Sequence, residues 1–463
     1  MTGQARPICV RGGEVVTAEA RTHADVYCED GVIKSVGPEL DCPADTEEID
    51  ASGAYVLPGA VDAHVHMELA FMGTVSSDDF ETGTAAGVAG GTTTIIDFVI
   101  PPHGQPLLDG LAEWHAKAEK AVADYAFHMA VTWWGDETSA EMASCVNEHG
   151  IPSFKTFMAY KGAIGIEDNE LLRVMETAQG LGAMVTAHCE DGDAVVAMQE
   201  KLLAEGKTAP RYHALSRPAP VEGRATERAA QLARQAGCPL YIVHMTCKES
   251  IEAVRAAQGR GQPVLGETCV QYLLLDDSVY ESDDFEGAAY VMSPPIRPLG
   301  NQEALWDALS AGVVHTVATD HCPFNLDGQK DMGSGDFTKI PNGAAGIEHR
   351  LSLMHTHGVL GGRLSLEQWV DACCTQPARL FGLAPRKGTI APGADADIAI
   401  FDPTATATIS AATHHHHVDR SIYEGFPLTG TVRQTLVAGR LQWNDGDLRV
   451  ERGAGRYLPR TLS

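Results

Sequence analysis

Residues 59–66, GAVDAHVH, end in two histidines separated by one residue. If this apolar stretch is a β-strand, His64 and His66 project from the same face, because side chains two residues apart in a strand point the same way. Two neutral imidazoles aimed at a common position make half of a metal site. The alternative for an isolated pair of this kind is two hydrogen-bonded core histidines. Ligands elsewhere in the chain would decide between the two.

Further residues that can bind metals occupy four other apolar runs. They are Lys155 in FKTF, His188 at the end of VTAH, His244 at the end of IVH and Asp320 at the end of VATD. Taken singly, a buried lysine is more often a salt-bridge partner, and a lone core histidine a hydrogen-bonded one. Six such residues at the same end of five strands are difficult to explain by packing alone. The pattern therefore favours a metal centre.

Four histidines, one aspartate and one lysine suit two divalent ions if the lysine carries carbon dioxide as a carbamate. Apolar walls and nearby cations favour the neutral amine, which is the form that adds carbon dioxide. The resulting carboxylate could bridge both ions. After the charges of the carbamate, Asp320 and a bridging hydroxide are subtracted, two divalent ions leave one net positive charge to meet a developing oxyanion.

Between residues 58 and 383, strand-like runs alternate with helical ones. Eight strands are expected, at 60–66, 92–100, 127–133, 153–159, 183–189, 240–245, 264–269 and 316–321. Leu107, Leu111 and Trp114 are spaced as one face of a helix, and Leu171 and Met175 repeat this spacing before the fifth strand. The pattern predicts an α/β fold, a (β/α)8 TIM-like barrel, in which chemistry sits at the carboxyl ends of the strands. A doubly wound sheet is the alternative, but no GxGxxG follows an early strand.

Both ends of the chain consist of short β-type runs broken by turn signals such as Gly12-Gly13, Asp30-Gly31 and Asn444-Asp445-Gly446. Neither piece could bury its apolar face alone. We therefore expect one β-sandwich domain built from both ends. The predicted division is 1–57 with 384–446 as the composite sandwich, 58–383 as the barrel and 447–463 as a C-terminal tail.

The composition excludes several classes of partner. The 463 residues contain 62 acidic and 34 basic side chains, for a net charge of −28, which would repel nucleic-acid phosphates and anionic lipids. The eleven cysteines are an odd number without a CxxC pair, as in a reduced cytosolic protein. The first twenty residues contain no apolar signal segment, and no apolar run is long enough to cross a bilayer. We expect a soluble, cytoplasmic protein with neither nucleic-acid nor membrane partners.

Seven motifs, in order along the chain, resemble the cyclic amidohydrolases, most closely their hydantoinase and dihydropyrimidinase branch within the amidohydrolase superfamily. They are DAHVH at 62–66, FKTFMAYKG at 154–162, TAHCE at 186–190, VH at 243–244, MSPPIR at 292–297, TDHCPF at 319–324 and IPNG at 340–343. The resemblance extends from the N-terminal β segment to about Gly446. Many separate motifs at plausible spacing make this a specific signal.

The resemblance implies a role for each site residue. His64, His66 and Asp320 would bind one ion and His188 and His244 the other, with carboxylated Lys155 and hydroxide as bridges. Tyr160 would donate to the oxyanion, and Ser293 and Asn342 would hold the amide edge of the ring. Zinc is the first expectation, and manganese or cobalt suit the same ligands. Without the resemblance, Tyr160 would be read as a core or rim residue and Ser293 as part of a turn.

The implied reaction is hydrolysis of a cyclic amide or imide, either a 5-substituted hydantoin or a dihydropyrimidine such as dihydrouracil, to an N-carbamoyl amino acid. Asp320 would move the proton from the nucleophile to the leaving nitrogen. Allantoinase and dihydroorotase are the near alternatives. In dihydroorotases a basic residue follows the histidine pair, whereas here MELAFM follows at 67–72. Leu69, Phe71 and Met72 are instead expected to line a pocket for a ring substituent, with ordinary loop packing as the alternative.

Non-enzymatic relatives with this fold have lost metal ligands, whereas every ligand position is filled here. The resemblance also implies a homotetramer, with a homodimer as the alternative. The internal run THHHH at 413–417 is interpreted as native sequence outside the barrel that could still bind metal opportunistically. Cys189 and Cys322 adjoin predicted ligands, but strand alternation should turn them to the opposite face.

Overall fold

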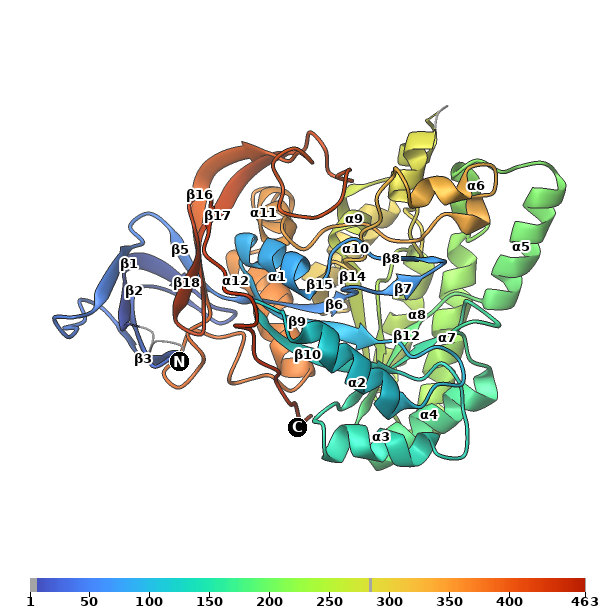
Figure 1. Ribbon diagram of the computed structural model, residues 1–463, viewed down its shortest axis with the longest axis horizontal. Helices are drawn as coiled ribbons and strands as arrows, with labels where there is room; N and C mark the ends of the chain where they lie inside the picture. The colour runs from blue at the N-terminus through green and yellow to red at the C-terminus, as the bar shows by residue number, and fades with distance from the viewer. Residues whose placement is uncertain (1–5, 283–284, 463) are drawn as a thin grey trace.

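The computed structural model describes residues 6–282 and 285–462, whose strands form two large sheets (Figure 1). The first sheet is parallel and has eight strands, hydrogen-bonded in chain order. They are β6 (Ala60–Val65), β9 (Thr92–Val99), β10 (Asp124–Ala130), β11 (Ser153–Phe157), β12 (Met184–His188), β13 (Leu240–Ile242), β14 (Val264–Cys269) and β15 (Thr316–Ala318). A bridge from Val65 to His321 brings the first and last strands together, so the sheet is a nearly closed barrel. The predicted fold class is confirmed.

Helices follow the barrel strands and cover the outside of the sheet (Figure 1). They are α1 (Phe80–Ala89), α2 (Leu107–Ala118), α3 (Thr138–Asn147), α4 (Asp168–Gly180), α7 (Ala219–Ala236), α8 (Lys248–Gly259), α9 (Val270–Leu274) and α10 (Asn301–Ser310). The predicted faces of α2 and α4 are buried at Leu107, Leu111, Trp114, Leu171 and Met175. An apolar stripe at helical spacing therefore packs each helix against the strands.

Shorter elements are inserted between or after these helices. They are the hairpin β7 (Ala70–Phe71) and β8 (Thr74–Val75), the helices α5 (Gly192–Ala204), α6 (Arg211–Leu215), α11 (Arg350–Leu353), α12 (Leu366–Val370) and α13 (Gln376–Leu380), 3-10 turns at Asp277–Tyr280, Phe285–Tyr290, Lys330–Gly333 and Phe337–Lys339, and π-helical turns at Met354–Val359 and Asp371–Thr375. The hairpin segment contributes Leu69 and Phe71 to the pocket described below, and the segment directly after β15 contributes Asp320, Cys322 and Asn342.

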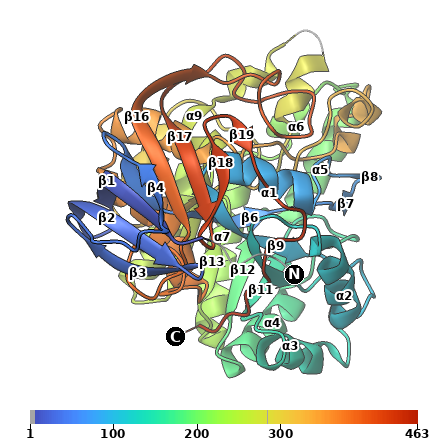
Figure 2. The same cartoon turned by 60° about the vertical axis from the view of Figure 1, so that its left-hand side comes forward.

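The second sheet takes strands from both ends of the chain, as predicted (Figure 2). Its nine strands are β1 (Ile8–Val16), β2 (Arg21–Glu29), β3 (Val32–Gly37), β4 (Glu47–Asp50), β5 (Tyr55–Pro58), β16 (Ile398–Thr408), β17 (Pro427–Val437), β18 (Arg440–Asn444) and β19 (Asp447–Leu448). β5 joins the two halves by pairing with β16, and the sheet has its own core around Val10, Val26 and Ile398. The predicted boundaries at 57/58, 383/384 and 446/447 remain our proposed division of the chain.

The two sheets are joined by buried ion pairs and by the last segment of the chain. Lys387 Nζ lies 2.5 Å from carboxylate oxygens of both Asp124 in β10 and Asp397 beside β16. Leu458 N donates to Tyr125 O, and Arg460 N donates to Gly150 O, so the C-terminal residues lie against the barrel. Burial of these charges is compensated by opposite charges rather than by solvent.

Two further observations bear on the expected class of protein. All eleven cysteines lie in the described part of the chain and are free, and all but Cys42 are buried. Within residues 6–282 and 285–462, no helix has the length and apolar character needed to cross a membrane.

Candidate metal centre and substrate pocket

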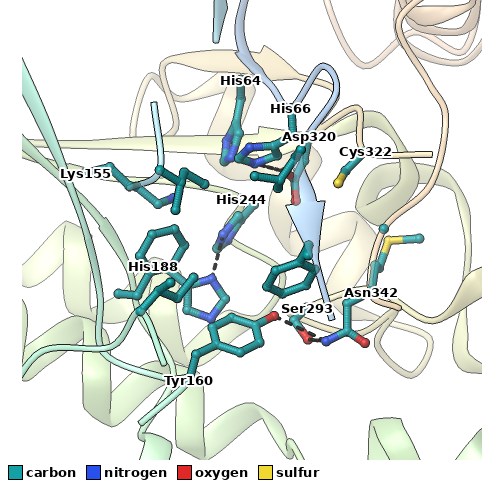
Figure 3. A pocket seen from close by; sticks show the side chains of 17 residues that line it. His64, His66, Lys155, Tyr160, His188, His244, Ser293, Asp320, Cys322 and Asn342 are labelled. Carbon is teal, nitrogen blue, oxygen red and sulfur yellow. Dashed lines mark hydrogen bonds and ion pairs between the residues drawn. The ribbon is translucent and has the colours of Figure 1, made fainter. Parts of the chain in front are cut away.

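All nine predicted site residues line one pocket at the carboxyl end of the barrel (Figure 3). They are His64, His66, Lys155, Tyr160, His188, His244, Ser293, Asp320 and Asn342. The parallel barrel brings them together, because every strand ends at the same rim. The alternative of separate core histidines therefore does not hold for this set.

His64, His66 and Asp320 form one half of the centre. Asp320 Oδ1 lies 3.1 Å from Nε2 of both histidines, and one ligand atom from each of the three residues lies within 4.8 Å of the others. Burial lowers the pKa of His66 to about 4, so this imidazole is neutral at pH 7. The nearby imidazoles of His64 and His66 hold the pKa of Asp320 below its usual range, against the effect of burial.

His188 and His244 form the other half, with His188 Nδ1 3.0 Å from His244 Nε2. The second ring nitrogen of His188 lies 2.8 Å from Glu190 Oε2, and Glu190 is paired in turn with Arg217 at 2.6 Å. Glu190 therefore favours a hydrogen on Nε2, so that Nδ1 of His188 presents a lone pair toward His244.

Lys155 lies near both halves, since its charge acts on the pKa of His66 and of His188; it is 1% exposed, with Nζ 4.9 Å and 5.0 Å from the ring centroids of Phe98 and Phe157. Among the described residues it has no ion pair within 4 Å, which removes the reading of a salt-bridge partner. Burial lowers its pKa from 10.5 to about 8, although Asp320 and Glu267 oppose the shift. A substantial fraction of the amine is therefore neutral near pH 8.

The donor set and its hydrogen bonds fit divalent metal ions. His64 Nδ1 is 2.6 Å from Glu267 Oε1, whereas His64 Nε2 is buried and makes no hydrogen bond within the described chain, although Asp320 Oδ1 lies 3.1 Å from it. A buried ring nitrogen without a partner is costly unless a ligand satisfies it. Imidazole nitrogens and a carboxylate are ligands that zinc, manganese and cobalt accept.

Three of the site residues adopt a left-handed backbone. Tyr160, His244 and Asp320 have φ angles of 59°, 42° and 51°. This conformation is uncommon for residues other than glycine, and strain of this kind gathers at functional sites. It also explains why β13 and β15 end at Ile242 and Ala318, earlier than the predicted strands.

The early end of β15 also corrects the expectation that Cys322 faces away from the pocket. Cys322 lines the pocket instead of facing away from it, because Asp320 lies beyond the end of β15 and strand alternation no longer applies there. Cys189 packs in the hydrophobic core, as expected.

Tyr160, Asn342 and Ser293 form a polar edge across the pocket from His64 and His66 (Figure 3). Asn342 Nδ2 donates to Tyr160 Oη at 3.3 Å and to Ser293 Oγ at 3.1 Å. Burial raises the pKa of the Tyr160 phenol, so it remains a protonated donor at neutral pH. The remaining wall is apolar and includes Leu69 and Phe71 but not Met72, which lies in the turn after β7.

Glu267 is a functional residue that sequence reasoning missed. It is fully buried in β14 and accepts from His64 Nδ1, from the main-chain N–H of His244 at 2.9 Å and from Tyr241 Oη at 2.9 Å. It thus orients ligands of both halves. The sequence feature that could have revealed Glu267 is a charged residue inside the otherwise uncharged strand segment VLGETC at 264–269.

We expect Glu267→Gln to weaken metal binding by about 10- to 100-fold, because loss of a ligand's hydrogen-bond partner has an effect of this size. Competition with a chelator measures the affinity. Glu222→Gln is the matched control, since Glu222 is similarly buried but pairs with Arg297 and Thr246 and has no contact with a ligand side chain among the described residues. Equal metal affinity in Glu267→Gln and the unaltered protein would contradict the assigned role.

Comparison with known proteins places this geometry in a family. Residues 55–441 match the sequence profile of the amidohydrolase family. The chain is 47% identical to a D-hydantoinase of Geobacillus stearothermophilus over 97% of this chain and 96% of that one. It is 44% identical to a dihydropyrimidinase of Arabidopsis thaliana, over 97% and 85% of the two chains. The crystal structure of dihydropyrimidinase from Brevibacillus agri NCHU1002 superposes with a TM-score of 0.97 at 46% identity, over 98% and 99% of the chains.

These matches cover nearly the whole chain, so they include both sheets as well as the site. They confirm the resemblance that the seven motifs indicated. The chain therefore belongs to the amidohydrolase family, and within it to the cyclic amidohydrolases of the hydantoinase and dihydropyrimidinase branch.

Proposed function

We propose that this protein uses two divalent ions to open a hydantoin or dihydropyrimidine ring to an N-carbamoyl amino acid. The observation that carries the proposal is the convergence of four histidines, Asp320 and an unpaired buried lysine in one pocket. The names of the relatives support both ring types, since they include D-hydantoinases and dihydropyrimidinases. The filled ligand positions argue against a non-catalytic interaction protein.

The proposed metal ligands are the same residues that the sequence predicted. His64, His66 and Asp320 would hold one ion, His188 and His244 would hold the other, and Lys155, as a carbamate, would supply a carboxylate to both. The neutral amine of Lys155 attacks carbon dioxide, forms the new nitrogen–carbon bond and releases a proton, which leaves the required carboxylate. Bound ions, zinc first among the candidates, would polarise the substrate carbonyl and lower the pKa of a water molecule.

The chain's own polar groups would then guide the reaction. Asp320 accepts the proton of the attacking water and returns it to the ring nitrogen as the carbon–nitrogen bond breaks. Tyr160 donates a hydrogen bond to the carbonyl oxygen as negative charge develops there. Ser293 and Asn342 bind the amide edge of the ring, largely through backbone groups, and the hydrogen bond from Asn342 Nδ2 to Ser293 Oγ already holds the two residues together.

The pocket lining favours a neutral ring with an apolar substituent. Leu69, Phe71 and Ile164 line one wall, and Lys155 is the only lysine or arginine among the lining residues. A substrate carboxylate, as in dihydroorotate, would therefore lack the basic partner that it needs. This disfavours the dihydroorotase alternative.

A substrate panel tests the proposal. Metal-loaded protein is incubated with dihydrouracil, hydantoin, D- and L-phenylhydantoin, dihydroorotate and allantoin, and the products are identified by mass spectrometry. We expect dihydrouracil or a hydantoin to gain one water and yield the N-carbamoyl amino acid, with dihydroorotate and allantoin turned over at least about 100-fold more slowly. Fastest turnover of dihydroorotate or allantoin would contradict the proposal, as would no turnover of any ring.

We further propose a cytoplasmic homotetramer, with a homodimer as the alternative. The eleven free cysteines support a reducing compartment. Sedimentation equilibrium of the metal-loaded protein measures the assembly state, and a monomer would contradict this part of the proposal.

A further inference from the structure

The histidine run at 413–417 is not part of the catalytic pocket. It lies in the segment between β16 and β17 and folds against the residues that precede α11, a helix that packs beside β17 (Figure 1). Glu348 Oε2 accepts from the main-chain N–H of His415 at 2.7 Å, and Glu348 Oε1 lies 2.8 Å from His415 Nδ1. The run is therefore held in a defined place, unlike a flexible purification tag.

Three side chains at this junction offer metal ligands. One ligand atom from each of Glu348, His349 and His416 lies within 4.8 Å of the others. His416 Nε2 is 4.0 Å from Glu348 Oε2. Ligand atoms of one tetrahedral zinc ion are about 3.4 Å apart, so only a small movement of the side chains is needed to complete the set.

Hydrogen bonds determine which nitrogen of His416 is available. His414 Nε2 lies 3.0 Å from Val418 O and must carry the hydrogen, because a carbonyl oxygen only accepts. His414 Nδ1 then accepts from His416 Nδ1, at 3.4 Å. His416 Nε2 then has a lone pair that points toward Glu348. It accepts one long hydrogen bond, from the main-chain N–H of Glu348 at 3.3 Å. Metal-binding histidines usually show this pattern, in which the second ring nitrogen donates to a fixed partner.

The other two ligands are also suitably placed. His349 is 9% exposed, its ring makes no hydrogen bond within the described residues, and its centroid lies 5.6 Å from that of His416. The Glu348 carboxylate is held in place by its two contacts with His415, one to the main-chain N–H and one to Nδ1. Its ion pairs in the described chain are with histidines alone.

A second group of potential metal ligands shows, by contrast, why the group of Glu348, His349 and His416 can accept a cation. Asp124, Asp395 and Asp397 are equally close together, but Lys387 and Arg456 already occupy the space between them. No lysine or arginine lines the cavity beside Glu348 and His349, which Thr413, His414 and Trp443 help to enclose. This cavity gives an ion a route to Glu348 and His349, two of the three ligands, and leaves room for water as a fourth ligand.

We propose that Glu348, His349 and His416 bind a third divalent ion of the zinc type, which fastens the 413–417 segment to the residues before α11. Two imidazoles and one carboxylate are a ligand set that zinc accepts. The site shares no ligand with the catalytic centre. It is nevertheless adjacent, since the His416 ring lies 5.2 Å from that of His321, the residue after Asp320.

Counting ions per chain tests the proposal. The protein is depleted with a chelator, dialysed against zinc and analysed by elemental mass spectrometry. We expect three ions per chain in the unaltered protein and two in His349→Gln, which should keep its ring-opening activity. His417→Gln is the matched control and should keep three ions, because His417 belongs to the same run but is exposed and only its main-chain N–H is bonded, to Asp78.

Two further variants separate this site from the others. Lys155→Met should lose the catalytic ions and retain one, so failure of the catalytic proposal would be visible independently. His349→Cys supplies an alternative ligand and should recover the third ion. Thermal unfolding should occur at a higher temperature when the third equivalent is present, and His349→Gln should not show this gain. An equal ion count in the unaltered protein and His349→Gln would overturn the proposal, whatever the stability of the variant.

Discussion

Replacing Lys155 by methionine should lower kcat/KM by at least about 10⁴-fold, the range observed when a member of a catalytic constellation is removed. The methionine side chain fills the apolar space beside Phe98 and Phe157, so the fold should persist. It cannot form a carbamate, and both halves of the centre would lose their bridging ligand. Ring opening and the two catalytic ions should therefore be lost together, as measured by turnover and elemental analysis.

Lys330→Met is the control for removing a buried lysine. Lys330 is also 1% exposed and burial lowers its pKa to about 7, but its Nζ donates to Val291 O and not to a metal ligand. This variant should keep both catalytic ions. In Lys155→Ala, which leaves space, a short carboxylic acid such as acetate should restore part of the activity. A fully active and metal-replete Lys155→Met enzyme would exclude the carbamate bridge.

Replacing Tyr160 by phenylalanine should lower kcat by about 10²- to 10³-fold, the cost of removing one oxyanion donor. The phenol lies at the polar edge of the pocket, where its oxygen is 3.3 Å from Asn342 Nδ2, and it is not a metal ligand. The ring contacts with Phe71 and His188 would remain. Steady-state kinetics should therefore show a fall in kcat with little change in KM, while both ions stay bound.

Tyr212→Phe is the matched control, because Tyr212 is partly buried against Phe337 and does not line the pocket. Its kinetics should equal those of the unaltered protein. If Tyr160→Phe keeps its kcat, Tyr160 is not the oxyanion donor. If the variant loses metal, its role is structural.

The barrel could be predicted because each strand and helix has its own local signal. Apolar runs such as 153–157 and stripes such as Leu107, Leu111 and Trp114 depend only on neighbouring residues. The ends of strands were harder to place. β13 and β15 stop before His244 and Asp320, whose left-handed backbone is imposed by the surrounding structure and has no marker in the sequence of a residue other than glycine.

The convergence of the candidate ligands was predictable for a similar reason. A histidine or lysine in an apolar run is conspicuous, and the order of strands in a barrel places all of them at one rim. The roles of Glu267 and Glu190 were not predicted, because a carboxylate can be assigned a role only when the ring nitrogen that it contacts is known. The same holds for Glu348, which lies 67 residues from His415 and 68 from His416, and for its neighbour His349.

The sequence by itself determined the class of fold and the family, and it identified nine residues that line one pocket, since these follow from residue type, spacing and motif order. Only the tertiary structure decided which nitrogen of each histidine faces the centre, which carboxylates orient them, and that Cys322 lines the pocket whereas Met72 does not. It also brought the 413–417 run to Glu348 and His349. The physical reason is that tautomer, burial and ligand distance are properties of pairs of groups, and the fold alone brings distant residues into contact.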